Sequence, residues 1–453
     1  MKRQAIQNWM SVMNERGLVG IATMVVCAAL AGCGSSSNVS GSDASTNSDA
    51  STNSDGTTLS DGAMQADASC SNGNCSLLDR LHRIEIPVDT GSAGRLVFAA
   101  PTDSNGALLA FPMQDQVHLK KVDAEGNAIG NDVVIEGQDP WGVAIHGDEW
   151  AVLVRRDRYV LKLVVVHPDG SQVFETTLVD PGPQDQWDQD GTEWFSGFRG
   201  IPGEQYVGVR DARLRWDGSH WAAYHTKQRR VGGIPHQGDT LRLVNPDGTF
   251  ASGGFGAGGF GCSHSLVVRL TQSGAPVTAA CLQDLPMEWR INDRVQAYVP
   301  GGHCDINYSL GTFFTGKDGD MILAGYVPGS SGGCQGFKVV AVRVHPDLSF
   351  DPPKTLVEEG SLDQDPSAVH MAPYEDGYLV GFHVGNSVSG DSTYLLAVAA
   401  DLTPIGPPEK SDALMSDLVA FNGGDFFQFS NGDVGWVFPS TPGILMYRVV
   451  ATK

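Results

Sequence analysis

The side chains best suited to metal chemistry gather between residues 216 and 305. Six of the imidazole and carboxylate residues in this stretch are the candidate metal ligands, namely His225, His236, Asp239, His264, His303 and Asp305. Imidazole and carboxylate groups are common ligands of zinc and other divalent transition metals. Should loops bring these residues together, the stretch would hold a divalent metal cofactor and act as a metal-assisted hydrolase or lyase.

No short motif of fixed spacing supports that chemistry, because H-E-x-x-H and C-x-x-C are both absent. The residues 254–259 match G-x-G-x-x-G, but a strand, not a helix, is predicted over 262–270, so a flexible glycine loop is the better interpretation. Gly261-Cys262-Ser263-His264-Ser265 departs from the nucleophile-elbow pattern G-x-S-x-G at its last position. Ordinary loop histidines therefore remain the alternative to a metal site.

A second candidate site is a long insertion over residues 181–204. It places four aromatic residues among carboxylates, namely Trp187, Trp194, Phe195 and Phe198. Exposed aromatic rings beside carboxylates can stack on a sugar ring and accept its hydroxyl protons. The same rings can instead pack together as the small core of an Ω-loop.

Six cysteines follow residue 33, and an even number in an exported chain indicates disulfides. Among the possible connectivities, pairing between sequence neighbours is favoured. The expected bonds are Cys70–Cys75, Cys262–Cys281 and Cys304–Cys334.

The elements that must position these residues are short strands joined by tight turns. Residues 159–167 are mostly apolar, Pro168-Asp169-Gly170 forms a turn, and residues 171–179 return as a second strand. Proline presets φ at the first corner of a turn, and Asp-Gly tolerates the remaining corners. The same kind of turn is predicted at 124–126, 246–248, 346–347 and 401–402, and a preceding turn at 147–148, 217–218, 317–319 and 375–377.

Two such hairpins in succession make a four-stranded antiparallel meander, and its repetition predicts an all-β fold of the β-propeller type. Seven blades are expected, with six blades or two β-sandwiches as the alternatives. Residues 83–88 are expected to complete the last blade and so join the two ends of the ring. The predicted blades are 96–136, 141–180, 212–252, 262–300, 309–358, 367–408 and 417–450, the fourth being poorly formed.

The chain begins with basic residues and an apolar run over 18–31, which is too short to span a membrane as a helix. That run ends in Leu30-Ala31-Gly32-Cys33, which resembles the lipobox of bacterial lipoproteins. The resemblance implies a signal peptide over 1–32, cleavage before Cys33, and a lipid on the Cys33 thiol. An uncleaved anchor and a plain secretory signal are the alternatives. Gly34 follows the cysteine, where an Asp would suggest retention at an inner membrane, so an outer-membrane location is expected.

Residues 33–69 follow as the lipidated cysteine and a spacer of Ser, Asp, Asn, Thr, Gly and Ala, in which residues 42–47 repeat as 48–53. Such a segment has too little apolar surface to offset its ordering entropy, so a disordered tether is predicted. The propeller domain is then assigned to residues 70–453.

The net charge of −22 argues against nucleic acid and anionic headgroups as partners. The order of lipobox, acidic spacer and propeller resembles exported lipoproteins of predatory or soil bacteria. The favoured function is a monomeric, lipid-anchored binding module that presents propeller loops to a glycan, peptide or protein partner. The metal-dependent enzyme is the alternative, disfavoured because no acid–base or nucleophile set has diagnostic spacing.

Overall fold

The chain divides into two compact units, Met1–Gly62 and Ala63–Lys453, and every residue described below belongs to the second. The computed structural model describes residues 75–88, 96–156, 160–180, 193–194, 211–231, 234–254, 268–271, 275–282, 288–292, 295–297, 310–316, 318–328, 336–361, 366–384, 392–411, 425–440 and 443–452. A 3₁₀ turn, Leu78–Arg80, is followed by strands throughout. No helix in these ranges has the length and apolarity that crossing a membrane requires.

The strands form seven separate antiparallel sheets, here called blades 1 to 7 in chain order. Blade 1 contains β2 (Phe98–Pro101), β3 (Ala107–Met113), β4 (Gln116–Val122) and β5 (Val133–Glu136). Blade 2 contains β6 (Asp139–His146), β7 (Glu149–Arg155), β8 (Leu161–Val166) and β9 (Gln172–Val179). Blade 3 contains β10 (Glu193–Trp194), β11 (Ala212–Trp216), β12 (Trp221–Val231) and β13 (Ile234–Val244), with both β10 and β13 paired to β12.

Blades 4 to 7 repeat the four-stranded pattern. Blade 4 contains β14 (Val268–Leu270), β15 (Thr278–Leu282), β16 (Glu288–Ile291) and β17 (Val295–Ala297), and blade 5 contains β18 (Leu310–Thr315), β19 (Met321–Pro328), β20 (Phe337–Val344) and β21 (Lys354–Val357). Blade 6 contains β22 (Pro366–Tyr374), β23 (Gly377–Val384), β24 (Ser392–Val398) and β25 (Pro404–Ser411). Blade 7 contains β26 (Phe427–Gln428), β27 (Val434–Pro439), β28 (Ile444–Val449) and β1 (Leu81–Ile86).

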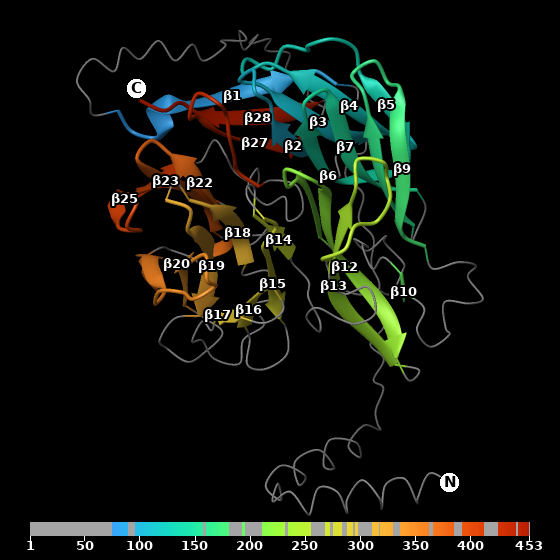
Figure 1. Cartoon of the computed structure of the whole chain (residues 1–453). Coiled ribbons are helices and arrows are strands. Elements are labelled where there is room, and N and C mark those ends of the chain that lie inside the picture. The colour runs from blue at the N-terminus through green and yellow to red at the C-terminus, as the bar shows by residue number, and fades with distance from the viewer. Residues whose placement is uncertain are drawn as a thin grey trace, which may run out of the picture. The chain divides into compact units, whose positions relative to one another are not determined.

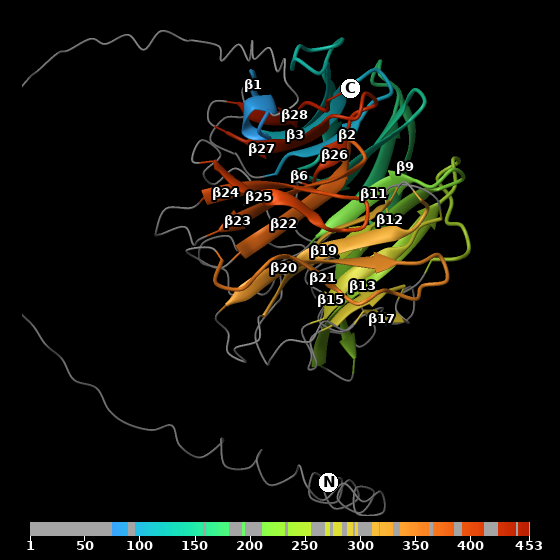
Figure 2. The same cartoon turned by 90° about the vertical axis from the view of Figure 1, so that its left-hand side faces the viewer.

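The innermost strands close a ring. In order around it, β2 contacts β6, β6 contacts β11, and the contacts continue through β14, β18, β22 and β26 back to β2. The blades follow one another around this ring in Figure 1, and blades 5 and 6 face the viewer in Figure 2. β1 pairs with β28 in continuous register from Leu81↔Val449 to Ile86↔Ile444, so the first strand completes the last blade. The propeller with seven blades, closed by its N-terminal strand, is therefore confirmed, and the two-sandwich alternative is wrong.

The predicted turns between third and fourth strands are also confirmed, and four blades share their chemistry. The carboxylates of Asp169, Asp247, Asp347 and Asp401 each accept the backbone N–H two residues further on, at 2.8–3.0 Å. Hydroxyl groups and these N–H donors hold the pKa of all four carboxyls below its usual range. This arrangement fixes each hairpin without help from the rest of the blade.

One residue in each of these turns has a positive φ, which glycine supplies without strain. Gly170 and Gly248 take that position in blades 2 and 3, whereas Leu348 and Leu402 take it in blades 5 and 6 with φ of 67° and 66°. Leu402 is buried against the core of blades 5 and 6. Burying a leucine contributes about 1.5–3 kcal/mol, which offsets the cost of about 1–2 kcal/mol for a left-handed L-residue.

The core lies between blades, because each sheet packs both faces against its neighbours. The inner and central strands are accordingly buried along nearly their whole length, as in β23, where every residue is buried. The outer strand β25 is mostly exposed or half-buried. This contrast leaves the inner strands as the elements that can hold a site at the centre of the ring.

Candidate functional site

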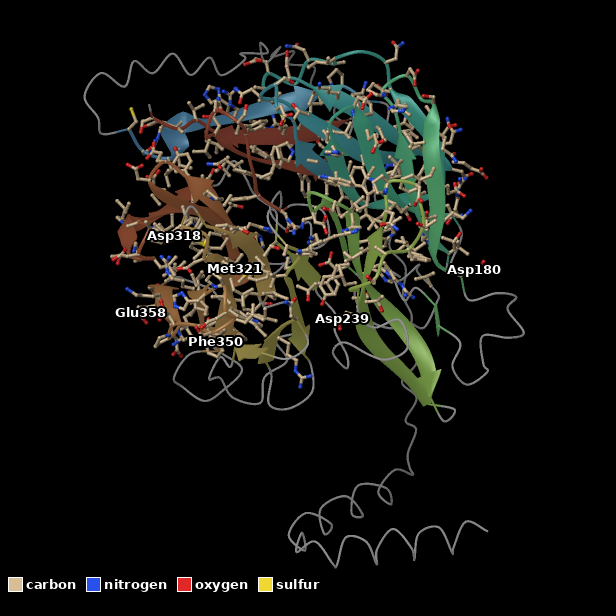
Figure 3. The ribbon with its side chains drawn as sticks, in the orientation of Figure 1. Asp180, Asp239, Asp318, Met321, Phe350 and Glu358 are labelled. Atoms are coloured by element: carbon tan, nitrogen blue, oxygen red, sulfur yellow. The ribbon has the colours of Figure 1, made fainter. Side chains whose placement is uncertain are left out.

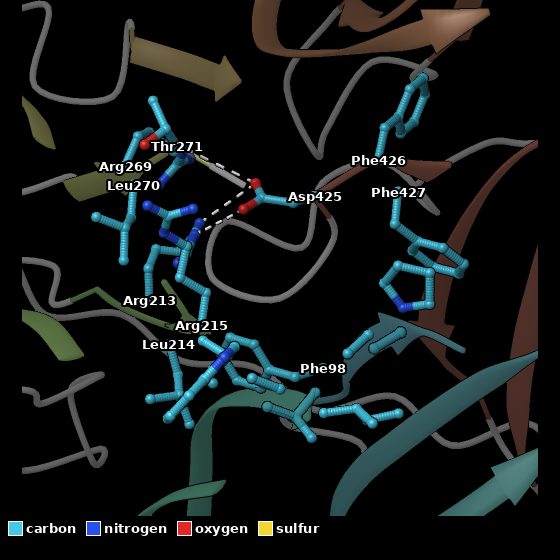
Figure 4. A pocket seen from close by; sticks show the side chains of 18 of the residues that line it. Phe98, Arg213, Leu214, Arg215, Arg269, Leu270, Thr271, Asp425, Phe426 and Phe427 are labelled. Atoms are coloured by element: carbon cyan, nitrogen blue, oxygen red, sulfur yellow. Dashed lines mark hydrogen bonds and ion pairs between the residues drawn. The ribbon is translucent and has the colours of Figure 1, made fainter. Parts of the chain in front are cut away.

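The inner strands enclose a cavity of about 290 Å³ at the centre of the ring. Its walls come from six blades, through β2, β6, β11, β14, β18 and the segment 425–427 at the start of β26. Figure 4 shows the charged and aromatic side chains that line it. Because six blades contribute to its walls, the cavity forms only when the ring is closed.

Four charged residues from three blades form a network at this cavity, here called the channel ion cluster: Asp211, Arg213, Arg269 and Asp425. Asp211 and Arg269 are buried, and Arg213 and Asp425 are part-buried. Arg213 donates two hydrogen bonds to the Asp425 carboxylate, from Nε to Oδ2 at 2.6 Å and from Nη2 to Oδ1 at 3.3 Å. Arg213 and Arg269 both donate to the carboxylate of Asp211. Arg269 also lies 3.7 Å from Asp425, measured from Nε to Oδ1 (Figure 4).

Asp211 does not line the cavity itself but holds the two arginines that do. It directly precedes β11, its side chain is fully buried, and it accepts a hydrogen bond from the backbone N–H of Val268 at 3.3 Å. Its own carbonyl accepts from the N–H of Thr226 at 3.1 Å. One residue therefore ties β11, β12 and β14 together and fixes both arginines at the cavity.

The cluster controls the protonation of Asp425. Burial alone would raise the pKa of this carboxyl, but Arg213, Arg269 and His370 together lower it to about 2. The Nδ1 atom of His370 lies 3.8 Å from the Asp425 carboxylate. Asp425 is 28 % accessible although it lies deep among the inner strands, so it offers a permanently ionised hydrogen-bond acceptor to the cavity.

Arg215 adds a third guanidinium group to the cavity lining. It lies two residues after Arg213 on β11, and the two-residue period of a strand places both on the same side. Only 7 % of Arg215 is accessible, and burial lowers its pKa to about 10 despite the attraction of Asp217. The charged residues among the described lining are Arg213, Arg215, Arg269 and Asp425, and Asp211 and Asp217 add carboxylates beside these arginines.

Aromatic side chains complete the wall. Trp216 lines the cavity and stacks on His146 with ring centres 4.1 Å apart. Phe426 also lines it and stacks on Trp436 at 4.7 Å and on His370 at 5.6 Å. These stacking contacts hold the rings in fixed orientations. The described lining thus combines paired guanidinium groups, the part-exposed carboxylate of Asp425 and the part-exposed indole of Trp216.

The structure does not bring together the two predicted metal ligands whose side chains it describes. His225 pairs with Thr240 and Asp239 pairs with Thr226 across β12 and β13. Paired residues share a face and neighbours alternate, so His225 and Asp239 lie on opposite faces of blade 3. His225 places Nδ1 3.0 Å from the carbonyl oxygen of Thr226, and the Asp239 carboxylate accepts a hydrogen bond from the hydroxyl of Tyr224. Asp239 is labelled among the side chains of the structure in Figure 3. No group of three or more metal-binding side chains occurs within the described ranges.

Most other predicted site residues lie outside the described part of the chain. His236 is placed only by its backbone, opposite Arg229, and Trp194 opposite Gln228. Cys75 is disulfide-bonded, and Cys281 lies in β15. Outside the described residues are His264, His303, Asp305, Trp187, Phe195, Phe198, Cys33, Cys70, Cys262, Cys304 and Cys334. The metal site, the aromatic ligand site and the disulfide pairings stay predictions.

Sequence reasoning missed Arg213, Arg215, Arg269 and Asp425. A signal was present in Ala212-Arg213-Leu214-Arg215-Trp216, where two arginines alternate along a strand expected to begin a blade. The first strand of each blade is the innermost one, so charged residues on such a strand indicate a polar site near the centre of the ring.

Comparisons with known proteins add a likeness of fold only. No family model and no curated protein matches this chain. The structure of YCF48 bound to D1 peptide is similar at a TM-score of 0.43 and 10 % identity, over 82 % of this chain and 96 % of that one. A thermostable family-43 glycoside hydrolase gives 0.33 and 13 % over 68 % and 86 % of the two chains. An endo-arabinase from Bacteroides thetaiotaomicron gives 0.33 and 12 % over 70 % and 95 %. At these scores none of the three carries an inference about activity.

Proposed function

We propose that this chain is a lipid-anchored, exported binding protein that holds its ligand in the cavity at the centre of the propeller. The observation that carries the proposal is the channel ion cluster together with Arg215. Buried ion pairs stabilise a fold little compared with well-packed apolar side chains, because removing charges from water is costly. The apolar core between blades already supports the ring, so charges lining a cavity are best explained by what they bind.

The protonation state of the Asp425 carboxyl favours binding over acid–base catalysis. A general acid or base works best with a pKa near the operating pH. Asp425, with a pKa of about 2, stays ionised at neutral pH and suits the role of a hydrogen-bond acceptor. This supports the binding module over a hydrolase that would use the same carboxylate for proton transfer.

Lipid anchoring is the second part of the proposal. It is supported by the sequence Leu30-Ala31-Gly32-Cys33 and by the polar spacer that separates Cys33 from β1. A binding domain on such a spacer would work at the surface of a membrane and leave the cavity open to solutes.

Thermal unfolding with a panel of monosaccharides, oligosaccharides and short peptides tests the binding site. A compound at a hundredfold excess over its dissociation constant stabilises the folded state by about 2.7 kcal/mol, so the melting temperature should rise by several degrees. Ala99→Trp fills the cavity from a half-buried position on β2 and should abolish that rise. Ala128→Trp, at an exposed position of blade 1 that bridges to Val122, is the matched control and should retain it.

A compound that stabilises the wild type and Ala99→Trp equally would place the ligand elsewhere and refute the central cavity as the binding site. The aromatic insertion over 181–204 would then be the next place to look.

A further inference from the structure

We propose that Asp320, His345 and Asp351 form a pH-sensitive clasp on blade 5, which holds two turns together while both ring nitrogens of His345 carry a proton and loosens when one proton is lost. These three residues are here called the His345 clasp. Asp318 and Met321, labelled in Figure 3, lie on either side of Asp320 in the chain. The clasp is separate from the cavity lining, so the proposal does not depend on the proposed function.

The imidazole of His345 contacts a carboxylate with each of its two nitrogens. Nδ1 lies 3.1 Å from Oδ1 of Asp320, which directly precedes β19, and Nε2 lies 3.2 Å from Oδ1 of Asp351, which lies between β20 and β21. A carboxylate only accepts hydrogen bonds, and a neutral imidazole has a single N–H donor. Both contacts can therefore be hydrogen bonds only when His345 is a doubly protonated imidazolium ion.

The charges around the ring favour the imidazolium ion. A hydrogen bond to Asp320 and a second to Asp351 raise the pKa of His345 above its ordinary value, and burial of this part-exposed ring opposes them only weakly. Asp347, in the same turn as the histidine, adds a third attractive carboxylate. The clasp should therefore keep its proton at pH values where an ordinary histidine has begun to lose it.

Asp320 also links the clasp to the neighbouring blade. Its second oxygen, Oδ2, accepts a hydrogen bond from Nη1 of Arg343 at 3.1 Å, and Asp318 accepts one from the same nitrogen at 2.5 Å. Nη2 of Arg343 donates to the carbonyl of Ala400, in the turn after β24 of blade 6. Burial raises the pKa of Tyr378 on β23, so this nearby hydroxyl of blade 6 stays neutral. A change at the clasp therefore reaches the contact between blades 5 and 6.

A carboxylate at the position of Asp351 is not required to form the turn. The backbone N–H of Asp351 donates to the third strand of its blade, and those of Ala251 in blade 3 and Ile129 in blade 1 make the same bond with apolar side chains. The second carboxylate on the imidazole therefore adds a property that these two turns form without.

The contribution of the clasp to stability is largest at acid pH. A histidine whose pKa is raised on folding stabilises the folded state fully below its unfolded pKa of about 6.5, and this contribution is lost as the pH rises through the folded pKa. The turn over 345–351 should therefore be held at about pH 5.5 and looser at about pH 8.5. Acidic surroundings would tighten this edge of the propeller, and alkaline surroundings would loosen it.

Nuclear magnetic resonance of ¹⁵N-labelled histidine side chains tests the clasp on the purified protein, with His345→Gln identifying the signals. At about pH 5.5 both nitrogens of His345 should carry a proton, and the titration midpoint should lie above about 6.5. Asp351→Asn should lower that midpoint, and the double variant Asp320→Asn/Asp351→Asn should return it to about 6.5. Asp115→Asn, at an exposed turn of blade 1, is the control and should leave it unchanged.

Amide hydrogen exchange measures the release of the turn. The N–H of Asp351 donates to the carbonyl of Arg343 at 3.0 Å, and its counterpart in blade 3, the N–H of Ala251, donates to Leu243 at 2.8 Å. Between about pH 6 and pH 8.5, protection of Asp351 should fall several-fold relative to protection of Ala251. In His345→Gln this ratio should stay constant across the same range.

Three results would overturn the proposal. One is a midpoint for His345 at or below about 6.5, or a ring nitrogen without a proton at about pH 5.5. Another is a midpoint that the double variant leaves unchanged. The third is a constant protection ratio in the wild type, which would show that the turn is not released. Asp351 is mostly exposed, so Asp351→Asn alone decides the second point where melting temperatures show that the double variant does not fold.

Discussion

Replacing Asp211 by asparagine is expected to lower the free energy of unfolding by about 3–5 kcal/mol, the cost of leaving a buried charge without its partner. The asparagine has nearly the same shape, so the loss comes from charge and hydrogen bonding. Arg213 and Arg269 both donate hydrogen bonds to the Asp211 carboxylate, and the Asp211 side chain is completely buried. Globular domains are stable by only about 5–15 kcal/mol, so the effect should be plain.

Urea denaturation of purified protein measures this loss. Asp115→Asn, at an exposed turn between β3 and β4, is the matched control and should stay within about 0.5 kcal/mol of the wild type. A loss below about 1 kcal/mol for Asp211→Asn would mean that the two arginines do not depend on this carboxylate, contrary to the geometry of the cluster.

Replacing Cys33 by serine is expected to move nearly all of the protein from the membrane fraction to the soluble fraction. Serine has no thiol to carry a lipid, and one acyl chain binds a membrane marginally whereas two or more hold firmly. Fractionation of cells, with detection of the propeller in each fraction, measures the change.

Ser37→Ala, within the same spacer, is the control and should stay with the membrane. Incorporation of labelled palmitate reports the lipid itself. If Cys33→Ser still takes up labelled palmitate, the lipid sits on another residue and the lipobox interpretation fails.

The blades were predictable from the sequence because their turns are locally determined. Pro168-Asp169-Gly170 and Pro246-Asp247-Gly248 need only their own side chains and backbone to form. Even the closing role of β1 could be predicted, since a propeller needs an outer strand for its last blade and residues 83–88 were the unassigned strand nearest the N-terminus.

The cavity was not predictable in the same way. Arg213, Arg269 and Asp425 come from three blades, and only closure of the ring brings them together. The relation of His225 to Asp239 depends on strand register, which a shift of one residue would reverse. The residue content of 216–305 therefore indicated polar chemistry in this region, but the charges at the centre of the ring are arginines and an aspartate.

The most direct test of the central cavity as a binding site compares the melting temperatures of the wild type and Ala99→Trp across the same panel of sugars and short peptides. We expect at least one compound to raise the melting temperature of the wild type by several degrees and to leave that of Ala99→Trp unchanged. An equal rise in both proteins would contradict a binding site at the centre of the ring.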